Sequence, residues 1–486
     1  MAINFNEIFD MNIPFVYAEL RKGISTTGTI KQEYTALIFG QKTSDGTSVV
    51  GEVLDIFSKE EAQAKFGKTS MLYAAIKRYY DINKSVKLKV IALDDDSTNG
   101  IQSTGNITIN GTASANGTLA FYVNGKSYKV AVAIGNTGAE IAVLLADKIA
   151  EYDDNQFTSV VDGTVPEKVN MTAVHFGSYG NTLKSIVNYN NDDVTPLGLT
   201  VSISDFAGGA GDPDLITTGV QAILENNQFN LIAQPYTDNA NLSLIDVALT
   251  DNFKATELLD GFCVVGINDT VTNLTTKTDT INTAFITVVD NHSVFATGFE
   301  QASGMIALIG DIAQSNPGAG YLNKELAGFL PLDERIRTER NVLAGGGVAT
   351  FRKQGTKVIL DRTVTTLQKD AQGIALAVDD TDLRVFLTIS YVRYTFIVRM
   401  SQYQNLNVGN DNDLFGPGVE VMTPNLYKQY LVMNYEQLVS DAVCENLEEF
   451  EASVIVEKVG NRMDSTMKIN VINVLLQQAM LIRYEV

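Results

Sequence analysis

The sequence is poor in the residues that carry most catalytic and metal-binding chemistry. It has no tryptophan, two histidines and two cysteines among 486 residues. Cys263 and Cys444 stand in apolar or acidic surroundings with no second cysteine nearby, which predicts buried, reduced thiols rather than a disulfide framework or a metal knuckle. Histidine is the side chain best suited to proton transfer near neutral pH. His175 and His292 are both expected to be hydrogen-bonded structural residues.

Long apolar runs and clustered basic residues are also missing. No stretch is apolar for long enough to cross a bilayer, and the first residues lack the basic flank and apolar run of a secretory signal. We therefore expect synthesis in a cytoplasm and no membrane insertion. Acidic residues number 57 against 36 lysines and arginines, a formal net charge of −21. Nucleic acid is not expected as a direct partner, because phosphate binding requires clustered positive charge.

Motifs for phosphate, metal or acyl-transfer chemistry are not found. The glycine clusters at 208–211, 318–320 and 345–347 match neither a phosphate loop nor a dinucleotide fingerprint, and predict linkers and tight turns. Ser178 stands in F-G-S-Y-G, where the first glycine is displaced from its place in a nucleophile elbow. The pair Glu448 and Glu449 lacks EF-hand spacing. We predict no catalytic residue, no metal site and no cofactor.

The residues that are present predict an α/β core. The chain is long enough for roughly three ordinary domains, and a hydrophobic content of 45% supplies the core. A strand pattern at Tyr34–Gly40 is followed by a capping box at Ser58 and Glu61, a second helix from Ser70, and a strand at Val86–Leu93. Strand, helices and strand in this order are typical of a parallel sheet with helices on its faces.

The pattern of the sequence changes between Ile101 and Phe206. Short alternating runs are separated by glycine, asparagine and threonine, and Asn124-Gly125 is a strong hairpin signal. One helix is expected at 138–152. This region predicts a mostly-β domain inserted into an α/β parent. Helix and strand alternate again after the linker at 208–211, with a strand expected at 293–297, which predicts the rest of a three-layer core.

The last third and both ends of the chain complete the expected organisation. Thr388–Met400 is compatible with a long strand or a helix, and Thr423-Pro424 is an N-cap and first position for a helix. The expected parts are an N-terminal arm, the first part of the core, the inserted β-rich domain, the continued core, a C-terminal domain and a C-terminal arm, at residues 1–22, 23–97, 98–207, 208–370, 371–466 and 467–486.

Both arms are β-capable. Ile13–Leu20 contains an early proline that suits an edge strand or a strand start. Met467–Val471 and Met480–Val486 alternate with period two. A β-capable segment at a chain end needs a sheet to join, either its own or a neighbour's. The pattern alone favours the chain's own sheet.

One segment, 335–366, is dense in basic side chains within this acidic chain. These side chains form either surface ion pairs, each of little energetic value, or a cationic surface suited to an acidic patch on another subunit. Periodicity does not decide between the two. The residues concerned are Arg335, Arg337, Arg340, Arg352, Lys353 and Arg362.

Several motifs occur in a particular order along the chain. E-R-N-V-L-A-G-G-G-V at 339–348 is followed by D-R-T-V-T-T at 361–366, then by F-G-P-G, M-T-P and N-R-M-D at 415–418, 422–424 and 461–464. The strand L-I-F-G, the helix pair around F-G-K-T-S-M-L-Y-A-A-I and Q-P-Y-T-D at 234–238 precede them. In this order the motifs resemble those of contractile phage tail sheath proteins of the Mu-like kind. The resemblance covers essentially the whole chain and is least specific in the β insertion.

The resemblance implies a structural protein that polymerises as stacked six-membered rings around a tail tube and contracts to drive the tube through a host envelope. It implies an outer position for the inserted domain, the tube, baseplate and terminator proteins as partners, and a place in the virion tail after assembly in the host cytoplasm. Strands of the arms would pair with neighbouring subunits. Met467–Ile472 is then expected to stay near its own core and Met480–Val486 to reach a neighbour.

The predicted contact residues follow from this reading. The intersubunit arms would use Phe15, Val16, Tyr17, Leu20, Met480, Ile482, Tyr484 and Val486. The intersubunit charge contacts would use Arg335, Arg337, Arg340, Arg352, Arg362, Glu448 and Glu449. The helix after Pro424 is a further candidate for facing the tube or a neighbour. The alternatives are another tail structural protein, of the tube or the baseplate, and an α/β hydrolase-like enzyme.

Overall fold

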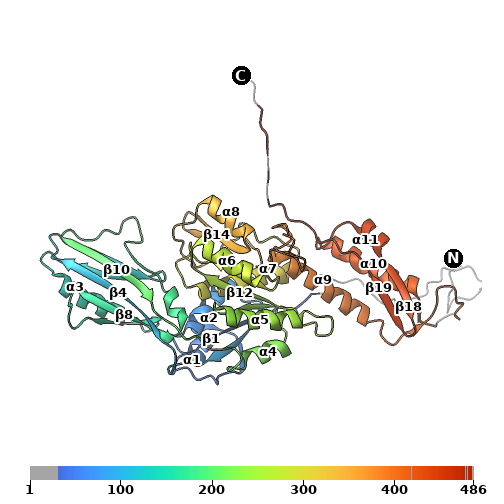
Figure 1. Ribbon diagram of the computed structural model, residues 1–486, viewed down its shortest axis with the longest axis horizontal. Helices are drawn as coiled ribbons and strands as arrows, with labels where there is room; N and C mark the ends of the chain where they lie inside the picture. Colours follow the sequence, from blue (N-terminus) through green and yellow to red (C-terminus); the bar gives the residue numbers. More distant parts are fainter. Residues whose placement is uncertain (1–30, 417–418, 477, 479, 484–486) are drawn as a thin grey trace, which may run out of the picture. The chain divides into compact units, whose positions relative to one another are not determined.

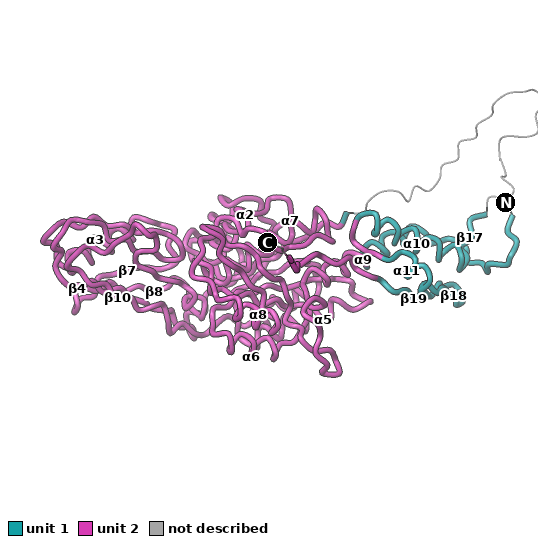
Figure 2. Tube along the Cα trace, turned by 90° about the horizontal axis from the view of Figure 1, so that it is seen from above, with its two compact units in different colours: residues 1–31, 393–441, 446–469 teal, residues 32–392, 442–445, 470–486 magenta. Residues whose placement is uncertain are grey.

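The computed structural model describes residues 31–416, 419–476, 478 and 480–483. The predicted N-terminal arm, with Phe15, Val16, Tyr17 and Leu20, lies outside this range, as do Tyr484 and Val486. The described chain forms two compact units, coloured in Figure 2. The larger comprises residues 32–392 and 442–445 together with the last segment from Asn470, and the smaller comprises residues 393–441 and 446–469.

The largest sheet in the described residues has eight strands in the order β15-β14-β13-β12-β11-β1-β3-β2. Its central strands are parallel, and β2 and β15 pair antiparallel with their neighbours at the two edges. The strands are β1 (Thr35–Gln41), β2 (Val53–Ile56), β3 (Lys87–Leu93), β11 (Leu231–Ala233), β12 (Phe262–Ile267), β13 (Ile286–Asp290), β14 (Val348–Gln354) and β15 (Lys357–Arg362).

Alternate residues of β1 enter two different hydrophobic cores, because successive side chains of a strand point to opposite faces. Ala36 and Ile38 join a core with α1, α2 and α7, whereas Leu37 and Phe39 join a core with α4, α5, α6 and α8. The helices are α1 (Lys59–Phe66), α2 (Met71–Ile82), α4 (Val220–Asn226), α5 (Asn239–Asn252), α6 (Val271–Ile281), α7 (Gly298–Ser315) and α8 (Arg337–Gly345). The predicted mixed α/β class is confirmed.

Local capping explains why the first helices begin where the sequence predicts. The Ser58 hydroxyl accepts a hydrogen bond from the Glu61 N–H, and the Ser70 hydroxyl accepts one from the Tyr73 N–H. Gly67 ends α1 at a φ of 87°, in the region that favours glycine. These turns fix the start of α2, and the N-terminus of α2 contacts the inserted domain.

The inserted domain has a core of its own between two antiparallel sheets and one helix, α3 (Figure 1). The sheet orders are β10-β4-β8-β7 and β6-β5-β9. Asn124 and Gly125 have φ of 47° and 77°, which matches the predicted hairpin turn. The elements are β4 (Gln102–Gly111), β5 (Gly117–Val123), β6 (Lys126–Val132), α3 (Gly138–Ala150), β7 (Phe157–Val161), β8 (Lys168–Phe176), η1 (Ser178–Thr182), β9 (Ser185–Val187) and β10 (Leu199–Ala207).

The smaller unit contains two complete helices, the end of a third from Arg393, and two separate pairs of strands. The Tyr435 and Phe450 rings stack at 3.7 Å between α10 and α11. The Thr423 hydroxyl accepts from the Leu426 N–H and caps α10, as the Thr-Pro pair predicts. The elements are β16 (Asn407–Val408), β17 (Val421–Met422), α10 (Pro424–Ser440), α11 (Leu447–Ser453), β18 (Ile455–Val459) and β19 (Arg462–Thr466).

Three segments differ from, or go beyond, what the sequence predicts. Thr388–Met400, left open between strand and helix, lies in helix α9 (Leu383–Ser401), within which the boundary between the two units falls. The strand predicted at 293–297 is wrong, because the Thr297 hydroxyl instead caps α7. Met467–Val471 forms no strand within this chain beyond one bridge from Val471 to Cys444, since no longer partner runs beside it among the described residues.

Two further findings bear on the sequence expectations. Cys263 and Cys444 are both buried, as predicted, and burial raises the pKa of the Cys263 thiol well above its usual range. Among the described helices, none has the length and apolar character that a bilayer crossing requires.

Candidate functional sites

The carboxyl ends of parallel strands are where α/β proteins usually bind ligands. Here that edge holds a buried ion pair. Asp290, the last residue of β13, receives hydrogen bonds from Arg335 Nε at 2.7 Å and from Arg335 Nη2 at 3.1 Å. Both side chains are nearly solvent-free, at 4% exposure for Asp290 and 8% for Arg335. Arg335 also donates to the carbonyl of Asp269, just beyond β12. The pair therefore ties two strand ends together.

A lysine from the inserted domain reaches the same edge. Lys184 Nζ donates to the carbonyl of Val294 at 2.6 Å and to the carbonyl of Asn291. Burial lowers the pKa of Lys184 to about 7, and the negative charge of Asp290 opposes this shift. The amine thus satisfies two backbone acceptors in the loop after β13 and fastens the inserted domain to the core.

This environment predicts a pH-dependent stability. The unfolded Lys184 keeps its proton up to about pH 10, whereas the folded one loses it near pH 7. The unfolded chain therefore binds more protons between these values, so the contribution of Lys184 to stability increases as pH rises through this window. We expect the stability of wild type relative to Lys184→Met to grow by on the order of 1 kcal/mol between about pH 7 and pH 8. Denaturant titrations at the two pH values measure it.

The matched control is Lys254→Met, which removes an exposed lysine on the same unit. Its difference from wild type should stay constant over the same pH range. An equally constant difference for Lys184→Met would show that the folded amine keeps its proton, contrary to this prediction.

His175 is a hydrogen-bonded structural residue, as the sequence predicts. Its Nε2 accepts a 2.9 Å hydrogen bond from the Met71 N–H at the start of α2, and its Nδ1 lies 3.0 Å from Asp95 Oδ1. Nε2 is therefore unprotonated and Nδ1 donates to the carboxylate. The ring is 1% exposed, so it joins β8 of the inserted domain to the core. His292 is exposed, and its N–H donates to Asp290.

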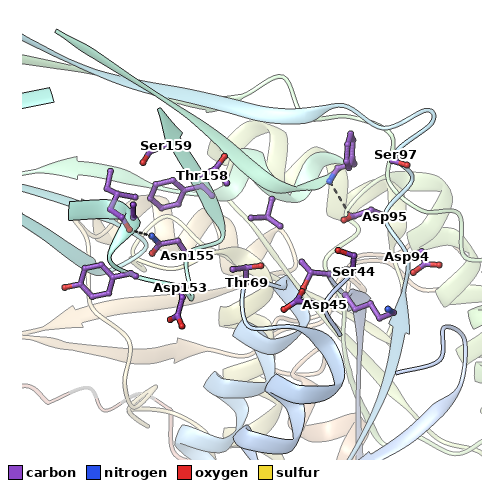
Figure 3. A pocket seen from close by; sticks show the side chains of 18 residues that line it. Ser44, Asp45, Thr69, Asp94, Asp95, Ser97, Asp153, Asn155, Thr158 and Ser159 are labelled. Atoms are coloured by element: carbon purple, nitrogen blue, oxygen red, sulfur yellow. Dashed lines mark hydrogen bonds between the residues drawn. The ribbon is translucent and has the colours of Figure 1, made fainter. Parts of the chain in front are cut away.

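A cavity of about 850 Å³ lies between core loops and the inserted domain. Figure 3 shows Asp45, Asp94 and Asp95 on the core side, and Asp153 and Asn155 from the inserted domain. Asp95 is already engaged with His175, Gln41 and the Phe176 N–H. No group of potential ligands in the described residues is arranged to hold a metal ion.

The structure gives most of the arginines of segment 335–366 partners inside the chain. Arg340 lies 3.0 Å from Glu334 and 3.1 Å from Asp361. Arg352 donates to Asn323 at 2.9 Å, and Arg362 donates to Asp379 at 2.5 Å. Arg335 is buried with Asp290, as described above. These contacts match the ion-pair interpretation, and a role between subunits stays a prediction.

Arg337 differs from its neighbours. It is exposed and has no ion pair among the described residues. Together with Arg340 and Arg362 it lines a groove of about 480 Å³ on α8 and β15. On α11, Glu448 is exposed and Glu449 is paired with Lys468. Arg337 and Glu448 are thus the members of the predicted charge set that remain available to a partner.

The last segment is anchored at one end and exposed at the other. The Ile472 N–H donates to the Val443 carbonyl at 3.1 Å, and Arg384 Nη1 donates to the Ile472 carbonyl at 2.9 Å. Beyond it, Met480, Leu481 and Ile482 are 79%, 82% and 80% exposed and form no strand in this chain. Three consecutive apolar side chains in water are energetically unfavourable, and a contact of this segment with a neighbouring subunit stays a prediction.

The ribbon β18–β19 offers strand edges in the smaller unit. Val459 pairs with Arg462 across a two-residue loop, so the alternation of antiparallel pairing directs the backbone groups of Val456 and Ser465 away from the ribbon. No described residue pairs with either outer edge. The ribbon packs against α10 through β18, and unpaired strand edges are templates for strand addition.

Sequence reasoning missed Asp290 and Lys184. Each is a single polar residue in an otherwise ordinary stretch, and its partner lies 45 or more residues away. No local pattern marks such a pair. The nearest signal was the density of arginines that begins at Arg335.

The comparisons with known proteins complete this picture. No family model matches the chain. The chain is 27% identical over 471 residues to the Mu-like prophage FluMu tail sheath protein of Haemophilus influenzae, covering 95% of this chain and 94% of that protein. It is similar to the contracted sheath of an extracellular contractile injection system, PVC, with a TM-score of 0.51, 9% identity and 99% of each chain covered. It also matches a sheath tail protein from Desulfitobacterium hafniense with a TM-score of 0.49, 11% identity and 93% and 100% coverage.

These findings support a role as a structural protein, and more specifically a similarity to tail sheath proteins. The predicted resemblance to tail sheath proteins of the Mu-like kind is confirmed by the match over nearly the whole of both chains. The fold is shared with a contractile injection system sheath.

Proposed function

We propose that this protein is the structural subunit of a contractile tail sheath. The match over 94% of a prophage tail sheath protein carries the proposal. The subunits stack as six-membered rings around a tail tube, with the tube, baseplate and terminator proteins as partners. The eight-stranded sheet and its helices are the three-layer core, and the terminal segments are arms. Subunits assemble in the host cytoplasm and end in the virion tail, without membrane insertion.

Strand addition is the physical basis that we propose for the polymer. The exposed segment at Met480–Ile482 leaves one subunit, and the edges of β18 and β19 on a neighbour have unused backbone groups. Pairing satisfies those groups and covers the apolar side chains together. A contact between two different surfaces does not close on itself and propagates as rings or helices. The cores then move relative to one another during contraction while the arms keep them connected.

Electron microscopy of the purified full chain tests the proposal. We expect long, hollow polymers of uniform diameter at high protein concentration, because each subunit carries both an arm and an acceptor. Antibody labelling of virions should place the chain along the tail. Small discrete particles at every concentration, together with unlabelled virions, would contradict the proposal.

Electron microscopy also tests the enzyme alternative, which predicts small discrete particles instead of long polymers. A hydrolase-like enzyme with this fold would use the carboxyl edge of the sheet, which Arg335, Asp290 and Lys184 occupy. At the β12 and β13 end of that edge these groups bind one another, which favours a structural role there. The ends of β1 and β3 border the cavity of about 850 Å³ instead.

A further inference from the structure

A pocket beside α2 concentrates positive charge in an acidic protein. Its volume is about 270 Å³, and it lies between α2, the β5–β6 hairpin and residues 154–157. Two acidic residues, Asp154 and Glu300, line it together with four cationic ones. The chain as a whole has 57 acidic residues against 36 basic ones. The pocket thus reverses the charge balance of the protein. Its cationic residues are Lys68, Lys77, Arg78 and Lys126.

Two of the four cations are held firmly by groups inside the chain. Arg78 Nε donates to Glu300 at 2.9 Å, and its guanidinium lies 4.8 Å from the centre of the Phe329 ring. Lys126 Nζ donates to Asp154 and lies 4.2 Å from the centre of the Tyr152 ring. These two side chains build the wall of the pocket and keep its potential positive.

The other two cations are free to bind a further acceptor. Lys77 is 45% exposed and lies 3.8 Å from Asp154, which Lys126 already neutralises. Lys68 is 35% exposed and is paired with Asp153, whose side chain is 77% exposed. Exposed pairs of this kind contribute about 0–1 kcal/mol. Exchange of such a partner for an incoming carboxylate therefore costs little.

An amide donor at the pocket wall points to the same kind of ligand. The Asn124 side chain is fixed by its Oδ1, which accepts a 3.0 Å hydrogen bond from the Lys184 N–H. Its buried Nδ2 donates to no described residue. Asn124 lines the same pocket as Lys68 and Lys77, and an unsatisfied amide donor is suited to an acceptor that carries negative charge once a side-chain rotation exposes it.

We propose that this pocket binds a carboxylate-bearing surface of a second copy of this chain. Copies with a net charge of −21 repel one another, so a stable polymer must place acidic groups against the sites where positive charge is in excess. The inference rests on the proposed function, because only a polymer brings copies together at high local concentration. It adds a contact between the folded parts of neighbouring subunits to the proposed contact through the arms.

The test compares polymer formation by two double variants of the full chain. Lys68→Gln/Lys77→Gln removes the two available cations of the pocket. The matched control, Lys87→Gln/Lys254→Gln, removes two exposed lysines that are also ion-paired but lie outside it. The change in net charge is the same. We expect the pocket variant to raise the critical concentration for polymerisation about tenfold at physiological salt, and the control to change it less than twofold.

Each outcome decides the proposal. Equal critical concentrations for the two variants would overturn it while leaving the proposed function intact. Absence of polymers from wild type would overturn both. A melting temperature that inorganic phosphate raises in wild type and in the control but not in the pocket variant, with polymerisation equal in all three, would identify a small-anion site and overturn the contact with a second copy. Unchanged melting temperatures of both variants without phosphate establish that they fold.

Discussion

Deletion of residues 479–486 is expected to leave a folded, soluble chain that no longer forms long polymers. The deleted part includes Met480, Leu481 and Ile482, which are about four-fifths exposed. Their removal costs the single chain no described packing, so we expect a change in unfolding free energy below about 0.5 kcal/mol. Under the proposed strand addition, the polymer loses the strand that each subunit would contribute to its neighbour. Melting temperature and electron microscopy measure the two effects.

A longer deletion is the control. Removal of residues 470–486 also takes away the backbone bonds of Ile472 to Val443 and Arg384, and should lower the melting temperature by several degrees. If the short deletion lowers it equally, the last residues belong to their own domain. The sequence pattern alone favoured that outcome.

The acceptor can be located in the same assay. Val456→Pro and Ser465→Pro each remove an N–H that faces away from the β18–β19 ribbon, so the ribbon itself keeps its ladder bonds. The edge that accepts the arm is the one whose proline variant blocks polymerisation. Two variants that both polymerise like wild type would exclude the ribbon as acceptor.

Arg335→Met is expected to have the largest effect on the stability of the single chain. It leaves the Asp290 carboxylate, 4% exposed, without its bidentate partner and removes the donor to the Asp269 carbonyl. Breaking a buried pair in this way costs about 3–5 kcal/mol. The double variant Arg335→Met/Asp290→Leu should recover part of this loss, because it removes the uncompensated charge. Urea titration of the full chain below its polymerisation concentration measures both.

Arg337→Met provides the matched control two residues further on. Arg337 is exposed and has no ion pair among the described residues, so its replacement should change stability by less than about 0.5 kcal/mol. Equal losses for Arg335→Met and Arg337→Met would show that Arg335 does not act through the buried pair. The comparison also separates a stability role for Arg335 from a role between subunits.

The sequence predicts the fold best where a few neighbouring residues decide the conformation. Ser58 and Glu61 begin a helix because their capping bond spans three residues, and Asn124-Gly125 turns a hairpin because both adopt positive φ. Residues 388–400 could not be assigned, since a run rich in β-branched and aromatic side chains fits either period. The strand expected at 293–297 fails because Thr297 caps a helix instead.

The sequence also predicted some features of the candidate sites and missed others. Motif order along the chain indicated the tail sheath, and the comparisons confirm that resemblance. The arginine-rich segment was recognised, but its partners were not. Arg335 and Arg337 are two residues apart and have opposite environments, because one points to the end of β13 and the other to solvent.

The sequence by itself determined the α/β class, the β-rich character of residues 101–206 and the lack of recognisable catalytic motifs, since composition and short-range patterns are sufficient for each. The tertiary structure alone decided which charges meet. Lys184 reaches Val294 across 110 residues, and Lys68 and Lys77 share a pocket with Asn124 and Lys126. Electrostatic contacts act over a few ångströms in space, and only the folded chain sets those distances.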